Sequence, residues 1–324
     1  MAIDFICMAN EGYARWIELC VRAIERRQPG SAIYLYDLSE AVDSALRRQF
    51  ERHGAVRYTH FPPSEWKSPA WVETMDFDFI WPRWDLRESI KFYSRKLRIL
   101  LGGARHENWM LDKAAHTLKT RGMLRLYAQK PHVIARTLEA SPNNLVFIDA
   151  DAIVLKRLDE VFDLEFDMAL TAEAPQDVVV GPWPPQCTER PSYPHIAINV
   201  GVMFVRHSPR MHPLLDAWIR EMETVQHLSI EQTALAHLIY RLAPGFYQGH
   251  YRAHTLVLDG GEATLMALPM PRYNFLKMRV TDRDFAPEVH DAHFAGGKKQ
   301  EAHWAWVRKM IADEFQDGAR HPLS

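Results

Sequence analysis

The sequence predicts an α/β protein in which a mostly parallel, Rossmann-like sheet is flanked by helices. Short apolar runs alternate with helical patterns over the first 60 residues. This rhythm indicates a parallel sheet, because each helix carries the chain back to the start of the next strand. The chain of 324 residues shows no internal repeat and no low-complexity linker. We therefore expect a single extended domain rather than two small ones.

The first elements follow directly from hydrophobic periodicity and from breaker residues. Residues 3–9 form a short apolar run, and the next segment places Trp16, Leu19, Cys20 and Ala23 on one helical face before Pro29-Gly30 ends it. The elements expected in this part are strands at 3–9, 32–36 and 56–60 and helices at 13–27 and 41–53.

The later elements are separated by two segments without clear periodicity. The first, at 62–87, is rich in tryptophan, proline and acidic residues, and the second, at 175–194, is rich in proline; both are typical of long loops. The elements expected around them are helices at 88–101, 130–139, 213–225 and 231–241, strands at 144–148, 167–171 and 196–205, and an amphipathic tail at 303–315.

Composition excludes several classes of protein. Lys plus Arg is 39 and Asp plus Glu is 41, a net charge of −2, which argues against a nucleic-acid binder with a basic tail or patch. No apolar run approaches the roughly 20 residues that span a bilayer, and the first residues lack the basic region of a signal peptide. We expect a cytoplasmic protein without a transmembrane segment, with peripheral attachment to a membrane as the second possibility.

Cysteine and glycine patterns remove further alternatives. Cys7, Cys20 and Cys187 form no C-x-x-C pair, which excludes a cysteine-rich zinc site and predicts reduced thiols. The sequence contains no G-x-G-x-x-G, no P-loop motif and no G-x-S-x-G. Dinucleotide-loop and nucleophile-elbow chemistry therefore has no support.

The most informative segment is 145–155, in which a predicted strand ends in Asp149 and Asp151. Residues i and i+2 of a strand project to the same face, so the two carboxylates can point together. Ligands of open α/β sheets bind at the carboxyl ends of strands. Adjacent negative charges repel unless a cation lies between them, and Mg²⁺ or Mn²⁺ suits carboxylate and phosphate oxygens. The alternative is a solvated or capping pair, because D-x-D also occurs by chance.

The surrounding residues favour the metal site. The run FIDADAIVLKRLDEVF at 147–162 resembles the metal-binding strand of retaining glycosyltransferases with the GT-A fold, and more specifically the family 8 galactosyltransferase and glycogenin group. Five other stretches resemble motifs of that group in the same order, over roughly residues 3–299. They are Ile6–Tyr13 (strand and turn for base and ribose), Tyr127–Lys130 (Tyr followed by a basic residue), Ile198–Phe204 (Asn-x-Gly), Glu231–Thr233 (Asp-Gln) and His293–Lys299 (His-x-x-Gly-x-x-Lys).

The resemblance implies a function and a set of site residues. It implies metal-dependent transfer of a sugar from a nucleotide-diphosphate sugar, a UDP-sugar, to a glycan, metabolite or protein acceptor, with retention of anomeric configuration and with Mn²⁺ or Mg²⁺ as cofactor. The implied metal ligands are Asp149, Asp151 and His293. The implied nucleotide contacts are Ala9, Asn10, Tyr13, Lys130, Asp149, Ala150, Gly296 and Lys299. The implied donor-sugar contacts are Asn199, Gly201 and Gln232, and the implied catalytic residues are Gln232, Glu231 and Lys299.

The resemblance also implies how the chain is divided. Residues 1–300 would form the GT-A domain, with a nucleotide-binding half up to about residue 155, a donor-sugar and acceptor half at about 156–300, and a helical tail at 301–324. Three positions depart from the group's pattern: Glu231 stands for its Asp, Glu11 for the acidic Asp near Asn10, and Gln300-Glu301 for the Pro-Trp after the final Lys.

Two other functions use the same residues. Phosphatases of the haloacid-dehalogenase type carry D-x-D at a strand end, but near the N-terminus and with a later acidic pair, whereas here the motif is mid-chain. The second alternative is a catalytically silent protein that binds sugar nucleotides. Release of UDP from a UDP-sugar with Mn²⁺ favours the transferase, and hydrolysis of a phenyl phosphate favours the phosphatase.

Overall fold

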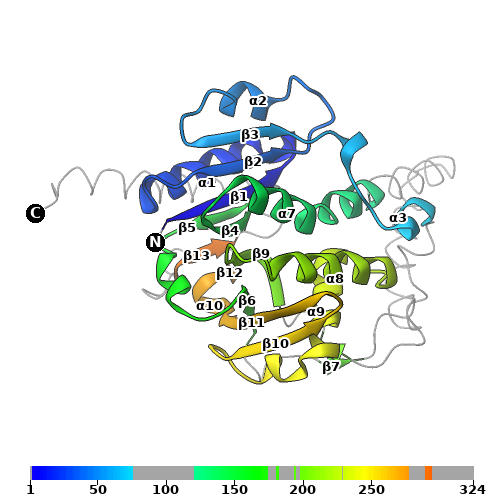
Figure 1. The fold of residues 1–324 in the computed structure, drawn as a ribbon. Helices are drawn as coiled ribbons and strands as arrows, with labels where there is room; N and C mark the ends of the chain where they lie inside the picture. The colour runs from blue at the N-terminus through cyan, green and yellow to red at the C-terminus, as the bar shows by residue number, and fades with distance from the viewer. Residues whose placement is uncertain are drawn as a thin grey trace, which may run out of the picture.

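An eight-stranded mixed sheet forms the centre of the molecule (Figure 1). The computed structural model describes residues 2–75, 120–173, 180–181, 193–194, 198–227, 229–276 and 289–293. In sheet order the strands are β10 (Ala253–Leu258), β11 (Gly261–Pro269), β6 (Met168–Ala172), β9 (Ile198–Val205), β4 (Asn144–Asp149), β1 (Ile3–Ala9), β2 (Ile33–Asp37) and β3 (Val56–His60).

The pairing of these strands is parallel on the N-terminal side and mixed on the other. Strands β4, β1, β2 and β3 run parallel, as do β6 and β11. Strand β9 is antiparallel to both of its neighbours, and β10 forms an antiparallel hairpin with β11. Four of the seven pairings are thus parallel, and the predicted α/β class is confirmed.

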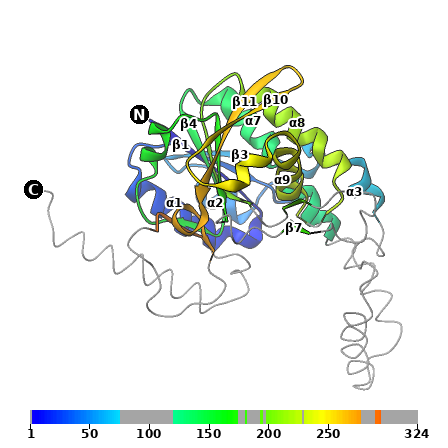
Figure 2. The same ribbon diagram turned by 90° about the horizontal axis from the view of Figure 1, so that it is seen from below.

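Helices cover both faces of the sheet (Figures 1 and 2). Alternate residues of a strand point to opposite faces: Phe5 and Cys7 pack in one core cluster with Ile17 of α1, while Ile6 and Met8 pack in another cluster with α7, α8 and α9. The helices are α1 (Ala14–Arg27) and α2 (Ala45–Phe50) on the first face and α7 (Lys130–Ala140), α8 (Met211–Thr224) and α9 (Ile230–Leu242) on the second.

A second, three-stranded sheet joins distant parts of the chain beside the end of β4. Strand β5 (Ala152–Val154) pairs antiparallel with β13 (Asp291–His293), which pairs parallel with β12 (Phe275–Leu276). The remaining elements are η1 (Glu11–Tyr13), η2 (Pro63–Glu65), α3 (Ala70–Thr74), η3 (Asp159–Asp163), β7 (Val180–Gly181), β8 (Tyr193–Pro194), η6 (Pro244–Gln248) and α10 (Met270–Tyr273).

Most predicted helices and strands lie within two residues of their observed bounds, and the helix expected at 41–53 is the exception. The observed helix spans only Ala45–Phe50. It begins at Ala45 because Ser44 caps it: the Ser44 Oγ accepts a hydrogen bond from the Arg47 amide at 3.0 Å. The same hydroxyl donates to Asp37 at the end of β2. This bond holds the preceding residues outside the helix.

Several predictions fall outside the described residues. These are the helix at 88–101, the tail at 301–324, residues 76–87 of the first predicted loop and most of the loop at 175–194. The described part of the first loop, residues 62–75, contains the short helices η2 and α3, which were not predicted. Cys7 and Cys20 are buried and free, as predicted. Among the helices of the described ranges, none has the length and apolar character that a membrane crossing requires.

Candidate functional site

The carboxyl ends of β1 and β4 meet in the middle of the sheet and define the site. The two strands are parallel neighbours, and their register pairs Met8 with Asp149. The chain leaves β1 towards β2 on one side, whereas β4 lies on the other side. Such a switch point at the carboxyl ends of parallel strands is where open α/β sheets bind ligands.

The turn after β1 brings Tyr13 towards this switch point. Asn10 shapes the turn, because its Oδ1 accepts from the Gly12 amide at 3.0 Å and caps η1. Tyr13 then lies half-buried where burial, followed by the charges of Asp151 and Asp149, raises the pKa of its hydroxyl. Tyr13 and the two aspartates come from separate sequence motifs, yet they interact electrostatically in the folded chain.

Asp149, the last residue of β4, forms a buried ion pair. Its Oδ1 lies 2.9 Å from Nζ of Lys130, whose side chain is only 4% exposed, whereas the Asp149 side chain is 24% exposed. Burial would lower the pKa of Lys130, but the carboxylates of Asp149 and Glu231 more than offset it, and the pKa is raised. The lysine therefore stays charged, and Asp149 is left with one side towards solvent.

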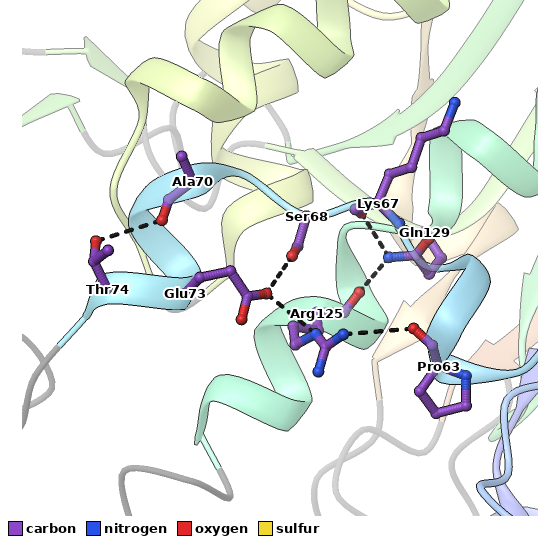
Figure 3. A network of polar contacts seen from close by, with 8 residues as sticks. All are labelled: Pro63, Lys67, Ser68, Ala70, Glu73, Thr74, Arg125 and Gln129. Atoms are coloured by element: carbon purple, nitrogen blue, oxygen red, sulfur yellow. Dashed lines mark hydrogen bonds and ion pairs between the residues drawn. The ribbon is translucent and has the colours of Figure 1, made fainter.

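Hydrogen bonds of Gln129, the residue before Lys130, anchor the start of α7 (Figure 3). Gln129 is fully buried, and its Nε2 donates to the carbonyls of Lys67 at 2.8 Å and Arg125 at 2.6 Å. Its Oε1 accepts from the Lys67 amide at 3.1 Å. These bonds tie the first turn of α7 to the segment between η2 and α3, so the lysine enters the site from a rigid support.

Glu231 reaches Lys130 from α9 on the same side of the sheet. Its Oε1 lies 3.4 Å from Nζ of Lys130, and the residue is 5% exposed. Its Oε2 has no hydrogen-bond partner among the described residues. Burial raises the pKa of Glu231, and the charge of Lys130 only partly opposes this effect.

Asn199 and Gly201 lie at an irregular point of β9. The register with β6 shifts between Leu170 and Thr171, and Oδ1 of Asn199 accepts from the Gly201 amide at 2.7 Å. Between these residues, the Val200 carbonyl accepts from Lys130 at 3.3 Å. Bulges of this kind re-aim side chains next to functional sites, and here the bulge connects the predicted sugar-binding strand to the lysine.

Strand β13 brings a segment about 140 residues distant to the aspartates. Its antiparallel register with β5 pairs His293 with Ala152, directly after Asp151. The chain thus folds back over this end of β4. The role of His293 as a metal ligand stays a prediction.

Asp291 on the same strand is a site residue that the sequence analysis missed. It is fully buried, and neither carboxylate oxygen has a hydrogen-bond partner in the described part of the chain. Burial, followed by the charges of Asp149 and Asp151, raises its pKa well above the usual range. Asp291 stands in a polar stretch of the sequence, between His290 and Ala292, so no local pattern indicated its burial.

Tyr127 is the second residue without a predicted role. It is half-buried, and the pKa of its hydroxyl is raised by burial and then by Glu231, against the opposing charge of Lys130. Asp149 and Asp151 raise it further, and Tyr127 in turn raises the pKa of Tyr13. The same two carboxylates therefore raise the pKa of both tyrosines.

Some of the remaining predicted site residues lie among the described residues and others do not. Ala9 and Ala150 are buried beside the strand ends, and Gln232 is half-buried on α9 next to Glu231. Gly296 and Lys299 lie outside the described residues.

The donor set fits a hard divalent cation that is shared with a ligand. No three His, Cys, Asp or Glu side chains within the described ranges are grouped so that they alone could hold an ion. Mg²⁺ characteristically takes one or two carboxylates and fills its other positions with water and substrate phosphates. Asp149 and Asp151 match that arrangement, and the excess of carboxyl groups over Lys130 favours a cation.

Comparisons with known proteins give only distant likenesses. No family model and no curated protein matches the chain. The galactosyltransferase LgtC, solved with donor and acceptor sugar analogs, is 14% identical over 96% of this chain and 95% of its own, with a TM-score of 0.46. The bifunctional glycosyltransferase WbbM is 12% identical over 91% of this chain and 46% of its own, with a TM-score of 0.48. The glycosyltransferase GlyE of Streptococcus pneumoniae is 12% identical over 98% of this chain and 64% of its own, with a TM-score of 0.45. With TM-scores below 0.5, these likenesses carry no functional conclusion for this chain.

Proposed function

We propose that the chain is a metal-dependent glycosyltransferase that moves a sugar from a UDP-sugar to a glycan, metabolite or protein acceptor, with retention of anomeric configuration. The observation that carries the proposal is the convergence at the end of β4. Asp149 and Asp151 lie there at a switch point of the sheet, with Lys130 and Glu231 buried behind them. The order of the six sequence motifs supports the same function.

The nucleotide would lie over the carboxyl ends of β1 and β4. Tyr13 would cover one face of the base, since an aromatic ring can stack on it, and Ala9, Asn10 and Ala150 would contact the nucleotide from the adjoining strand ends. Lys130 adds a positive charge at the junction between nucleotide and sugar. Asn199, Gly201 and Gln232 would contact the donor sugar from β9 and α9.

Loss of UDP leaves negative charge on the leaving diphosphate. When bound, Mn²⁺ or Mg²⁺ would neutralise that charge as it develops. Asp149, Asp151 and His293 would hold the ion, and Lys299 would contact the β-phosphate as a point charge. Glu231 and Gln232 would lie towards the anomeric carbon, where they orient the sugar for transfer.

A turnover assay tests the proposal against the other two functions. The protein is incubated with UDP-sugars and other nucleotide sugars plus Mn²⁺, and nucleotide release is measured beside hydrolysis of a phenyl phosphate. We expect Mn²⁺-dependent release of UDP from one UDP-sugar. Hydrolysis of the phenyl phosphate alone would indicate a phosphatase, and binding of the nucleotide sugar without release would indicate a silent binding protein.

A further inference from the structure

The proposed metal site already contains a cation that belongs to the chain. Nζ of Lys130 lies 2.9 Å from Oδ1 of Asp149, with 4% of the lysine side chain exposed. A buried charge pair is screened far less by water and salt than a surface pair. A divalent ion that binds Asp149 must therefore weaken this contact or share the carboxylate with it.

Lys130 has a second carboxylate within reach. Oε1 of Glu231 lies 3.4 Å from Nζ, and the other oxygen, Oε2, has no hydrogen-bond partner among the described residues. The Val200 carbonyl at 3.3 Å and the Phe147 ring, whose centroid lies 5.2 Å from Nζ, hold the ammonium in place. The lysine can thus give up Asp149 while it remains buried and paired.

We propose that Lys130 is an internal counter-ion that competes with the divalent cation for Asp149, and that Glu231 takes over the lysine when the cation binds. The inference rests on the proposed function only for the location of the metal. Competition weakens binding of the cation to the free protein. A nucleotide diphosphate offsets it, because its oxygens supply further ligands.

Mn²⁺ binding to the protein without nucleotide tests the competition, measured by electron paramagnetic resonance of the free ion. The decisive variant is Lys130→Met/Glu231→Gln, which removes a positive and a negative charge together and leaves the local net charge unchanged. We expect it to bind Mn²⁺ at least tenfold more tightly than the wild type, because Asp149 has lost its competitor. The difference should persist at 0.5 M salt, since the pair is buried.

Three further variants separate competition from a general electrostatic effect. Lys156 is exposed, so Lys156→Met should change the affinity less than twofold. Glu231→Gln alone should leave the affinity at or below the wild-type value, because Lys130 then pairs with Asp149 only. Lys130→Arg keeps the positive charge, and a guanidinium can donate two hydrogen bonds to one carboxylate. This variant should therefore bind Mn²⁺ no more tightly than the wild type.

Each result decides the question. The competition would be overturned if the double variant bound Mn²⁺ with an affinity within twofold of the wild type. It would also be overturned if Lys130→Arg bound Mn²⁺ more tightly than the wild type, and this variant provides the test if the double variant does not fold. Asp149→Asn distinguishes the two proposals: if it loses Mn²⁺ while the double variant matches the wild type, the metal site stands and the counter-ion is wrong. Absence of Mn²⁺ binding from the wild type and the double variant, both without and with UDP, would overturn both proposals.

Discussion

Two asparagines of the site each use the side-chain oxygen to build the local backbone. Oδ1 of Asn10 accepts from the Gly12 amide, and Oδ1 of Asn199 accepts from the Gly201 amide, in both cases two residues further along the chain. Asparagine favours such turns because its amide imitates a backbone group. Both side-chain oxygens are thus occupied within the chain.

Tyr13 should bind the nucleotide rather than the sugar. Tyr13→Ala removes the aromatic ring that would stack on the base, so we expect it to weaken UDP and UDP-sugar binding equally, each by about 0.5–1.5 kcal/mol of lost stacking. Tyr13→Phe keeps the ring and should retain most of the affinity. Isothermal titration with both ligands checks this, and a loss confined to the UDP-sugar would contradict the placement.

His132 on α7 should make stability depend on pH. Burial, with a contribution from the positive charge of Lys67, lowers the pKa of His132 to about 4. The folded state keeps the ring neutral below pH 6.5, whereas the unfolded chain takes up a proton. Stability should therefore fall by about 1–3 kcal/mol as the pH drops from 6.5 to 4.

Urea unfolding of the wild type and His132→Gln at pH 7.0, 5.5 and 4.5 measures this dependence. The variant cannot take up the proton at this position, so its stability should fall less over the same range. Identical curves for the two proteins would show that another group causes the acid sensitivity.

At the scale of elements, the start of α7 and strand β13 set the geometry of the site. The buried side chain of Gln129 ties α7 to the segment that follows β3, and Lys130 is the next residue. Strand β13 is held at its beginning by His290, whose amide donates to the Arg272 carbonyl at 2.6 Å. The residues that anchor α7 and β13, Lys67 and Arg272, lie far from β4 in the sequence. The aspartates therefore acquire these surroundings only in the folded protein.

The buried bonds of Gln129 should contribute more than an exposed ion pair between the same two segments. Gln129→Ala removes a fully buried side-chain amide and leaves backbone groups of Lys67 and Arg125 without this partner, at a cost of about 1–3 kcal/mol. Glu65 pairs with Arg136 at 3.5 Å, and both side chains are about half exposed, so Glu65→Ala should cost about 0–1 kcal/mol. Chemical denaturation of both variants measures the difference, and equal losses would mean that the Gln129 bonds do not anchor α7.

For the whole molecule, local patterns could predict the fold class and single out Asp149 and Asp151, but they could not predict the surroundings of these aspartates. The alternation of strands with helices and the spacing of Asp149 and Asp151 are local signals. The structure confirms the α/β class and has Asp149 at the carboxyl end of β4, whereas metal binding by the pair stays a prediction. The contact between Lys130 and Glu231 joins residues about 100 positions apart, and the burial of Asp291 depends on a strand that pairs with β5. Neither has a periodic signature, so only resemblance or the folded chain reveals them.

The hairpin of β10 and β11 had a local signal that the sequence analysis did not use. Asp259-Gly260 stands between two runs of apolar and β-branched residues, a characteristic hairpin turn. Gly260 and Gly261 adopt positive φ angles of 90° and 156°, which are favourable only for glycine. The two strands extend the sheet at the edge opposite β3.

Ligand binding at the switch point should stabilise the entire chain. A ligand that binds only the folded state at 100 times its Kd adds about 2.7 kcal/mol, which corresponds to a rise in Tm of about 5 °C for a protein of this size. We expect UDP with Mn²⁺ to give a larger shift than either alone. Thermal melts with a panel of nucleotides measure the rise in Tm. A larger rise with another nucleotide would show that the protein prefers a base other than uracil.

The most direct test of the metal-dependent transferase is UDP release by the wild type, Asp149→Asn and Asp151→Asn over a range of Mn²⁺ concentrations. We predict that the wild type loses activity in a chelator and regains it with Mn²⁺. Each variant should lose at least about 100-fold in turnover, the scale of one lost stabilising contact to a developing charge, while its circular dichroism spectrum stays that of the wild type. Turnover close to that of the wild type in either variant at low Mn²⁺ would contradict the metal site and the mechanism built on it.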